Sequence, residues 1–142
     1  MSKLRSLDIL IQIRERELDM LRRRMAVLEG QKEQFQGEIR RLARELEAEE
    51  AAAKSQLDML PFLQSYARKN AEEAKQYEQA IARLDGQIRE LNEIIQKIFG
   101  ELKKVEIAKE QLLAEMAEEE RREENKQMDE IAQQNFERRE TL

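Results

Sequence analysis

The sequence predicts an all-α fold in which two long helices pair as an antiparallel coiled-coil hairpin. Apolar residues recur at heptad spacing along most of the 142 residues, and one proline lies near the middle. The composition agrees, because 40% of the residues are charged and only 4% are aromatic. These proportions are typical of a narrow apolar seam between helices and not of a compact globular core.

The first apolar stripe predicts a helix over residues 4–60. Steps of three and four residues in turn lead from Leu4 to Leu60, and thirteen of the seventeen positions reached are apolar. The polar exceptions are Arg14, Lys32, Glu49 and Gln56.

The second stripe predicts a helix over residues 63–136. The same steps lead from Leu63 to Met116 with fourteen apolar positions out of sixteen, the exceptions being Asn70 and Lys109. The apolar run is unbroken from Tyr77 to Val105, so we expect the middle of this helix to be its most stable part.

Pro61 predicts a turn at about residues 58–64, because proline lacks an amide proton and clashes with the preceding helical turn. A single kinked helix would bury its stripe only by dimerising. An antiparallel hairpin buries the stripe within one chain, so we expect one domain over 1–142 and a monomer. A swapped dimer that opens the turn would keep the same contacts.

A turn centred on Pro61 predicts that paired residue numbers add to about 123. Phe35 then faces Ile88, and the two cations Arg14 and Lys109 meet at one level. We expect that layer to be hydrated and weak. A shift by one heptad would separate the two cations.

The stripe fails after Met116 and returns at Met128, Ile131 and Phe136. At this level no residue of the first predicted helix remains to pack opposite them. We expect the last twenty or so residues to overhang the hairpin as a single amphipathic helix, or to be mobile until a partner binds. The three apolar residues are candidate partner contacts.

The residues needed for most catalytic and metal sites are missing. The chain contains no histidine and no cysteine, which excludes imidazole triads, thiol nucleophiles and His or Cys metal sites. Its four glycines are isolated, so no phosphate-binding loop is present. We therefore expect a non-enzyme with no cofactor and no metal.

Charge and hydropathy point to a protein-binding role in the cytoplasm. The net charge of −5 argues against nucleic acid as a partner, because phosphate binding needs a basic face. No apolar run is long enough to cross a bilayer, and the opening residues lack the features of a signal peptide.

Two groups of residues away from the stripes are candidate docking surfaces. One is an apolar line on the first helix, edged by arginines: Ile9, Ile13, Met20 and Val27 with Arg16, Arg23 and Arg24. The other is the predicted hairpin tip with Phe62 and Tyr66, where aromatic side chains suit adaptable contacts. The alternative for the apolar line is that it covers a neighbouring helix or the overhanging C-terminal segment, and the alternative for the tip is that it caps the seam.

Five segments, taken in order, resemble the flagellar FliJ family, in its alphaproteobacterial form. They are the LxxLxxxR pattern at Leu7, Leu10 and Arg14, EAEE at Glu47–Glu50, PFLQSYA at Pro61–Ala67, FGELKKVE at Phe99–Glu106 and REENKQMDEIA at Arg122–Ala132. The resemblance covers nearly the whole chain.

This resemblance implies a non-catalytic component of the flagellar type III export apparatus, at the base of the flagellum on the cytoplasmic face of the inner membrane. The implied partners are the export ATPase hexamer, the cytoplasmic domain of the export gate and substrate chaperones. By analogy with the rotary ATPase γ subunit, the paired ends, Leu4 to Leu28 with Leu112 to Met128, would insert into the ATPase ring. Contact with the membrane would be only peripheral, through the apparatus.

The competing interpretation is a self-assembling scaffold without an ATPase partner. A filament needs heptads that continue without a mid-chain stop, whereas Pro61 and the matched halves favour closure within one chain. A designed hairpin is disfavoured because Arg14, Lys32 and Lys109 interrupt the stripes.

Overall fold

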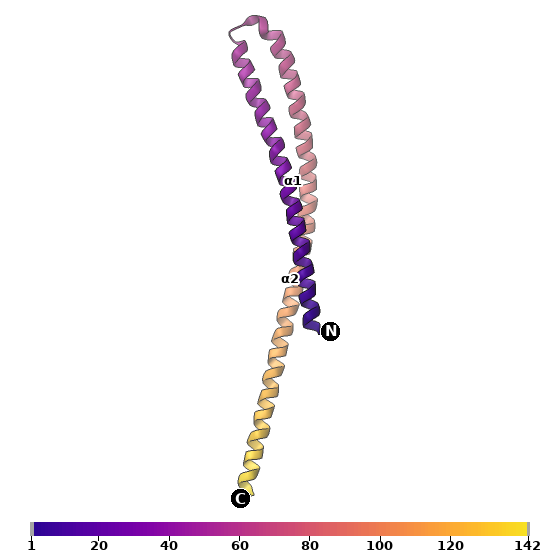
Figure 1. Cartoon of the computed structure of the whole chain (residues 1–142), viewed down its shortest axis with the longest axis vertical. Coiled ribbons are helices and arrows are strands. Elements are labelled where there is room, and N and C mark those ends of the chain that lie inside the picture. Colours follow the sequence, from indigo (N-terminus) through magenta and orange to yellow (C-terminus); the bar gives the residue numbers. More distant parts are fainter. Residues whose placement is uncertain (1, 142) are drawn as a thin grey trace. The chain divides into compact units, whose positions relative to one another are not determined.

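The structure is a computed structural model that describes residues 2–141, so the first and last residues of the predicted domain lie outside it. It contains two long helices, α1 (Lys3–Ala53) and α2 (Leu60–Glu140), joined through the short 3-10 helix η1 (Leu57–Met59) (Figure 1). No strand is present in the described part of the chain. The predicted fold class, an all-α helical hairpin, is confirmed.

The turn lies earlier than Pro61. Helix α1 ends at Ala53, seven residues before the predicted Leu60, and three residues then lead into η1. Pro61 is the second residue of α2. The physical reason is that the first turn of a helix has amide groups without an intrahelical acceptor, so proline fits there at little cost. Pro61 therefore begins a helix instead of ending one.

The chain forms two compact units, which we describe separately. The hairpin unit is Glu17–Lys97, and the terminal unit combines Met1–Arg16 with Ile98–Leu142. Both helices contribute to each unit, so each has its own short seam.

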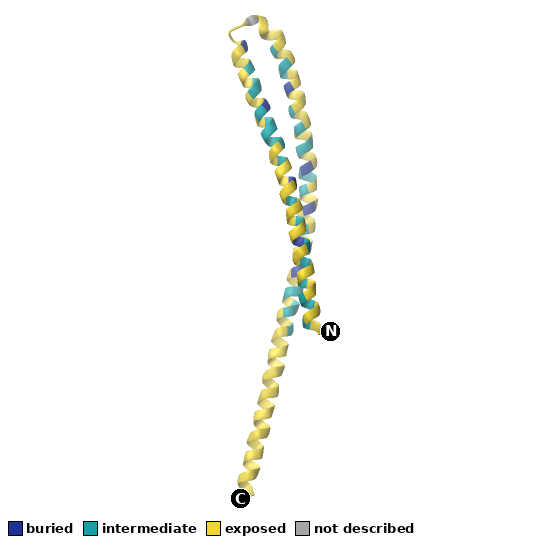
Figure 2. Ribbon diagram, in the orientation of Figure 1, coloured by how far each residue is buried: buried dark blue, intermediate teal, exposed yellow. Residues whose placement is uncertain are grey.

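The seam of the hairpin unit contains most of the buried apolar side chains (Figure 2). Leu28, Leu84 and Leu91 form a buried cluster, against which further half-buried residues pack: Leu21, Met25, Phe35, Ile88 and Ile95. Every one of these residues lies on a predicted stripe. The ring of Phe35 also packs against that of Tyr77, with 5.7 Å between centroids.

The pairing in the hairpin unit is antiparallel but not in the expected register. Asn70 Nδ2 donates to the carbonyl oxygen of Leu42 at 2.8 Å, and Lys32 Nζ lies 2.7 Å from Asp85 Oδ1. These paired numbers add to 112 and 117 (42 with 70, 32 with 85), against the expected 123. The difference is about one heptad, and it follows from a turn that is centred before Pro61.

The terminal unit shows the same shift. Arg14 Nε pairs with Glu101 Oε2 at 3.3 Å, and Lys109 Nζ pairs with Asp8 Oδ1 at 2.7 Å. The expectation that Arg14 and Lys109 share one layer is therefore wrong. Each cation lies in the seam opposite a carboxylate of the other helix, which compensates its charge.

Helix α2 continues past the beginning of α1 in the terminal unit. From Leu113 to Thr141 every residue is exposed, a longer stretch than the expected last twenty residues (Figure 2). The register explains the length, because α1 begins at Lys3 and its first seam residue, Leu4, already lies near the level of Leu112.

Candidate partner-binding surfaces

The predicted apolar line of α1 is exposed in both units. In the terminal unit Ile9 and Ile13 are a little over 40% exposed, and Arg16 is exposed beside them. In the hairpin unit Met20 is 69% exposed and Val27 is 50% exposed. No described residue packs closely enough on these side chains to bury them. The alternative, that the line covers a neighbouring helix of the same chain, is therefore wrong.

The arginines beside this line in the hairpin unit differ in their contacts. Arg23 Nη2 forms an ion pair with Asp19 Oδ2 one turn earlier, at 2.8 Å, and both side chains are largely exposed. Arg24 lines a shallow groove between the helices together with Leu91 and the exposed Ile94. Arg24 thus lies closer to the seam, and Arg23 is directed to solvent.

Phe62 and Tyr66 lie together in the first turns of α2. Their rings stack with centroids 6.3 Å apart, and Phe62 is 55% exposed while Tyr66 is half-buried. Met59 and Leu60 are also exposed. A small cavity of about 60 Å³ lies beside them, lined by residues that include Phe62 and Ala53. The tip therefore presents an apolar surface that its own turn leaves partly open.

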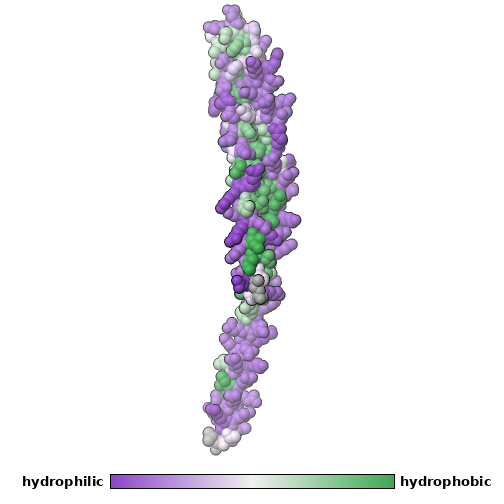
Figure 3. All heavy atoms as spheres, turned by 45° about the vertical axis from the view of Figure 1, so that its right-hand side comes forward, coloured by the Kyte–Doolittle hydropathy of each residue, from purple (hydrophilic) through white to green (hydrophobic). Residues whose placement is uncertain are grey.

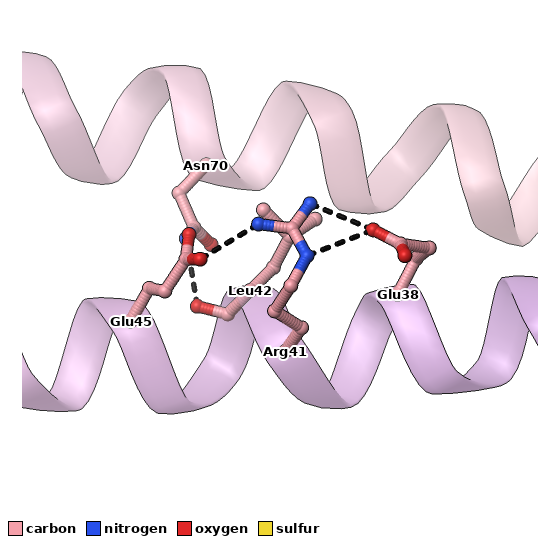
Figure 4. Close-up of polar contacts among 5 residues, drawn as sticks. All are labelled: Glu38, Arg41, Leu42, Glu45 and Asn70. Carbon is pink, nitrogen blue, oxygen red and sulfur yellow. Dashed lines mark hydrogen bonds and ion pairs between the residues drawn. The ribbon is translucent and has the colours of Figure 1, made fainter.

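A polar cluster that was not predicted from the sequence adjoins Tyr66. Arg41 reaches Glu38 and Glu45 on its own helix, each at 2.7 Å, beside the buried Asn70 of α2 (Figure 4). The hydrogen bonds to Glu38 and then to Glu45 raise the pKa of Arg41. The cluster could have been predicted from the sequence, because Glu38 and Glu45 lie three residues before and four residues after Arg41, which is the spacing of ion pairs on one helix face.

The same cluster affects the phenol of Tyr66. Partial burial raises its pKa above the ordinary value of 10.0, and the nearby carboxylates of Glu45 and Glu49 raise it further. A groove of about 520 Å³ runs between the helices here, lined by Arg41, Tyr66 and Asn70 among others. Within it, Arg41 is held by Glu38 and Glu45, so the groove combines a fixed ion-pair cluster with the half-buried ring of Tyr66.

The exposed part of α2 carries the most accessible candidates. Met128 is 69% exposed, Ile131 is 57% exposed and Phe136 is 61% exposed. Figure 3 shows mainly hydrophilic side chains in this part of α2, with a small apolar area among them. The three side chains have no apolar contact partner that buries them, as expected for a segment with no facing helix.

The chain matches the model of a known family, described as the flagellar FliJ protein, over residues 2–141. It belongs to the FliJ family. No curated protein and no solved structure shows a significant match. The family is a non-catalytic coiled-coil component associated with flagellar protein export, in agreement with the resemblance that the five sequence segments carry.

Two further observations apply to the described part of this FliJ-family chain. No group of three or more Asp or Glu residues there is placed to hold a metal ion. None of its helices contains an apolar stretch that would cross a bilayer.

Proposed function

We propose that this chain is the non-catalytic stalk of the flagellar export ATPase and an escort for export chaperones, acting on the cytoplasmic side of the export apparatus. The observation that carries the proposal is the exposed segment from Leu113 to Thr141, a helix with five large exposed apolar side chains and no facing helix in its unit. Family membership supplies the cellular context.

The terminal unit is the proposed insert for the ATPase ring. Its α2 segment carries Met128, Ile131 and Phe136, and its α1 segment carries Ile9 and Ile13, all exposed. Burying such side chains against a partner releases free energy of roughly 25 cal/mol per Å² of apolar surface. A ring lined by helices would supply that surface without any chemical step in this chain.

The tip of the hairpin unit is a separate proposed contact for the cytoplasmic domain of the export gate or for chaperones. Phe62 is exposed there and stacks on Tyr66, so the pair offers a rigid aromatic surface. Aromatic residues are enriched in the binding cores of protein interfaces.

The test is size-exclusion chromatography with light scattering on the chain alone and mixed with the export ATPase of its own organism. We expect a monomer that forms a stable complex with the ATPase. Ile131→Asp and Ile13→Asp should each weaken the complex by about tenfold or more, since each places a charge in an apolar contact.

Matched controls place the same charge on exposed polar positions of the same helices, at Gln134→Asp and Gln12→Asp. These variants should bind the ATPase as the unaltered chain does. Concentration-dependent polymers that do not bind the ATPase would instead support the self-assembling scaffold.

A further inference from the structure

The heptad spacing continues through the turn without a change of phase. Steps of three, four, three and four residues connect Ala53, Gln56, Leu60, Leu63 and Ala67. A closed hairpin does not require this, because a turn allows the second stripe to begin at any phase. A single helix running from residue 53 to residue 67 does require it, since only then does one face carry the whole stripe.

The turn itself is close to a helical conformation. Only residues 54–59 separate α1 from α2, and Leu57–Met59 already form a 3-10 helix. The amide of Lys54 still donates to the carbonyl oxygen of Glu50, four residues earlier, at 3.2 Å. No residue with a positive φ angle occurs in the described chain. The turn can therefore straighten into a helix without any residue leaving a left-handed conformation.

The seam is complementary to a second copy of itself. In a heptad the two core positions are a and d, and an antiparallel pair places each a of one helix opposite a d of the other. In this chain that arrangement requires paired residue numbers that add to about 116. Such a register is symmetric about residue 58. Two straightened chains would therefore make the contacts of the closed hairpin between copies, including those of Leu28 with Leu84 and Leu91. They would also pair the former turns with each other.

Pro61 acts against the straightened form. In the hairpin it is the second residue of α2, where its missing amide proton costs little. In a continuous helix it would remove the hydrogen bond to the carbonyl oxygen of Leu57 and its ring would clash with that group. Gln56 weakens the new contact as well, because it occupies a core position in that form.

We propose that the same seam can form between two copies of the chain when the turn straightens into a helix. Pro61 is the residue that disfavours this dimer and keeps each chain folded as a hairpin. The partner in this proposal is a second molecule of the same sequence. The proposal is independent of the ATPase, so its failure would leave the stalk function untouched.

The first test compares Pro61→Ala with the unaltered chain by analytical ultracentrifugation after unfolding and refolding at high concentration. Removing two prolines from the dimer should lower its dissociation constant by roughly 100-fold or more. Gln64→Ala, an exposed substitution one turn into α2 that retains the proline, should leave the chain monomeric. Pro61→Gln provides a second variant, so the result does not depend on the folding of one protein.

The second test identifies which chain supplies each helix. Chains with natural nitrogen and chains labelled with ¹⁵N are mixed before refolding, and a carbodiimide then joins Lys32 Nζ to the Asp85 carboxylate, 2.7 Å away. The Pro61→Ala dimer should contain cross-links between isotopes, and the unaltered monomer should contain none. A monomeric Pro61→Ala, a dimer without mixed cross-links, or an unaltered chain that dimerises as tightly would overturn the proposal.

Discussion

The two units use the same heptad spacing but bury it to different extents. The hairpin unit buries Leu18, Leu28, Leu42, Leu84 and Leu91, among others. Among the described residues of the terminal unit, Leu102 alone is buried. Buried apolar side chains are therefore concentrated in the hairpin unit, whereas both units carry exposed ones, although a single pair of helices forms both.

Ion pairs occupy part of the seam in the terminal unit. In the terminal unit two seam positions are the cations Arg14 and Lys109, whose partners Glu101 and Asp8 are partly exposed. Partly exposed ion pairs contribute little, about 0–1 kcal/mol each. A buried leucine at the same position would contribute more.

The largest expected effect separates the two seams directly. Leu28→Ala in the hairpin unit should lower the free energy of unfolding by about 3 kcal/mol, because Leu28 is 3% exposed and its removal leaves a cavity. Leu7→Ala in the terminal unit should cost about 1 kcal/mol, since Leu7 is only half-buried. Denaturant unfolding followed by circular dichroism measures both, and equal losses would contradict the comparison.

The next effect concerns Asn70, the one polar side chain that is buried among the described residues of the hairpin seam. Asn70→Leu should raise the free energy of unfolding by about 1 kcal/mol, because replacing a buried polar group with a packed apolar one is neutral or stabilising. The backbone carbonyl of Leu42, which accepts the hydrogen bond from Asn70, remains within helix α1 in this variant. Asn92→Leu, at an exposed position of the same helix, is the control and should raise the free energy of unfolding by only a few tenths of a kcal/mol through helix propensity. A loss of stability in Asn70→Leu would show that the hydrogen bond outweighs the burial cost.

Two glycine substitutions in α2 compare the hairpin unit with the terminal unit without touching the seam contacts. A Cβ added at Gly86 or at Gly100 meets no heavy atom within 4 Å. Gly86→Ala should raise the free energy of unfolding by about 0.8 kcal/mol through helix propensity. Gly100→Ala should give a smaller rise if the terminal unit opens before the hairpin unit unfolds, and thermal melts of the two variants decide this.

Asp8→Asn tests the ion pair at the beginning of α1. It should lower the free energy of unfolding by at most about 0.5 kcal/mol, because both partners are partly exposed. Hydrogen exchange should nevertheless become faster in residues 4–14 and stay unchanged in residues 18–42. High salt should produce the same local change in the unaltered chain, and uniform acceleration along α1 would argue against separate units.

The smallest effect is the titration of Tyr66. Its phenol should ionise above pH 10.0, and Glu45→Gln should bring the pKa back toward that value. Since the pKa is raised in the folded state, the contribution to stability is present below the pKa of the unfolded chain and is lost as pH rises through the folded value. Ultraviolet absorbance of Tyr77→Phe, which leaves Tyr66 as the only tyrosine, follows the ionisation.

The fold was predictable because periodicity determines which residues form a seam. Every described position of the predicted stripes from Leu4 to Ala53 and from Leu63 to Leu112 is at least half-buried. Periodicity alone does not determine register, because two heptad stripes match again after a shift of seven residues. Polar side chains distinguish these alternatives, and the contact of Asn70 with Leu42 is one that only the structure identifies.

The turn was misplaced because Pro61 was interpreted as the end of a helix. Proline is equally suited to the first turn of the next helix, and residues 51–60 contain no glycine that would mark the end of α1. The candidate surfaces were found as exposed apolar residues, but their partners remain predictions, since a sequence pattern does not identify what covers it.

The thin seam also determines how this protein responds to temperature. Seven apolar side chains are buried among the described residues, few for a chain of this length. The heat capacity change of unfolding follows the apolar surface that becomes exposed, so it should be small per residue. The stability curve is then broad and shallow, and the hairpin should resist cold far better than a globular domain of equal size and equal maximal stability.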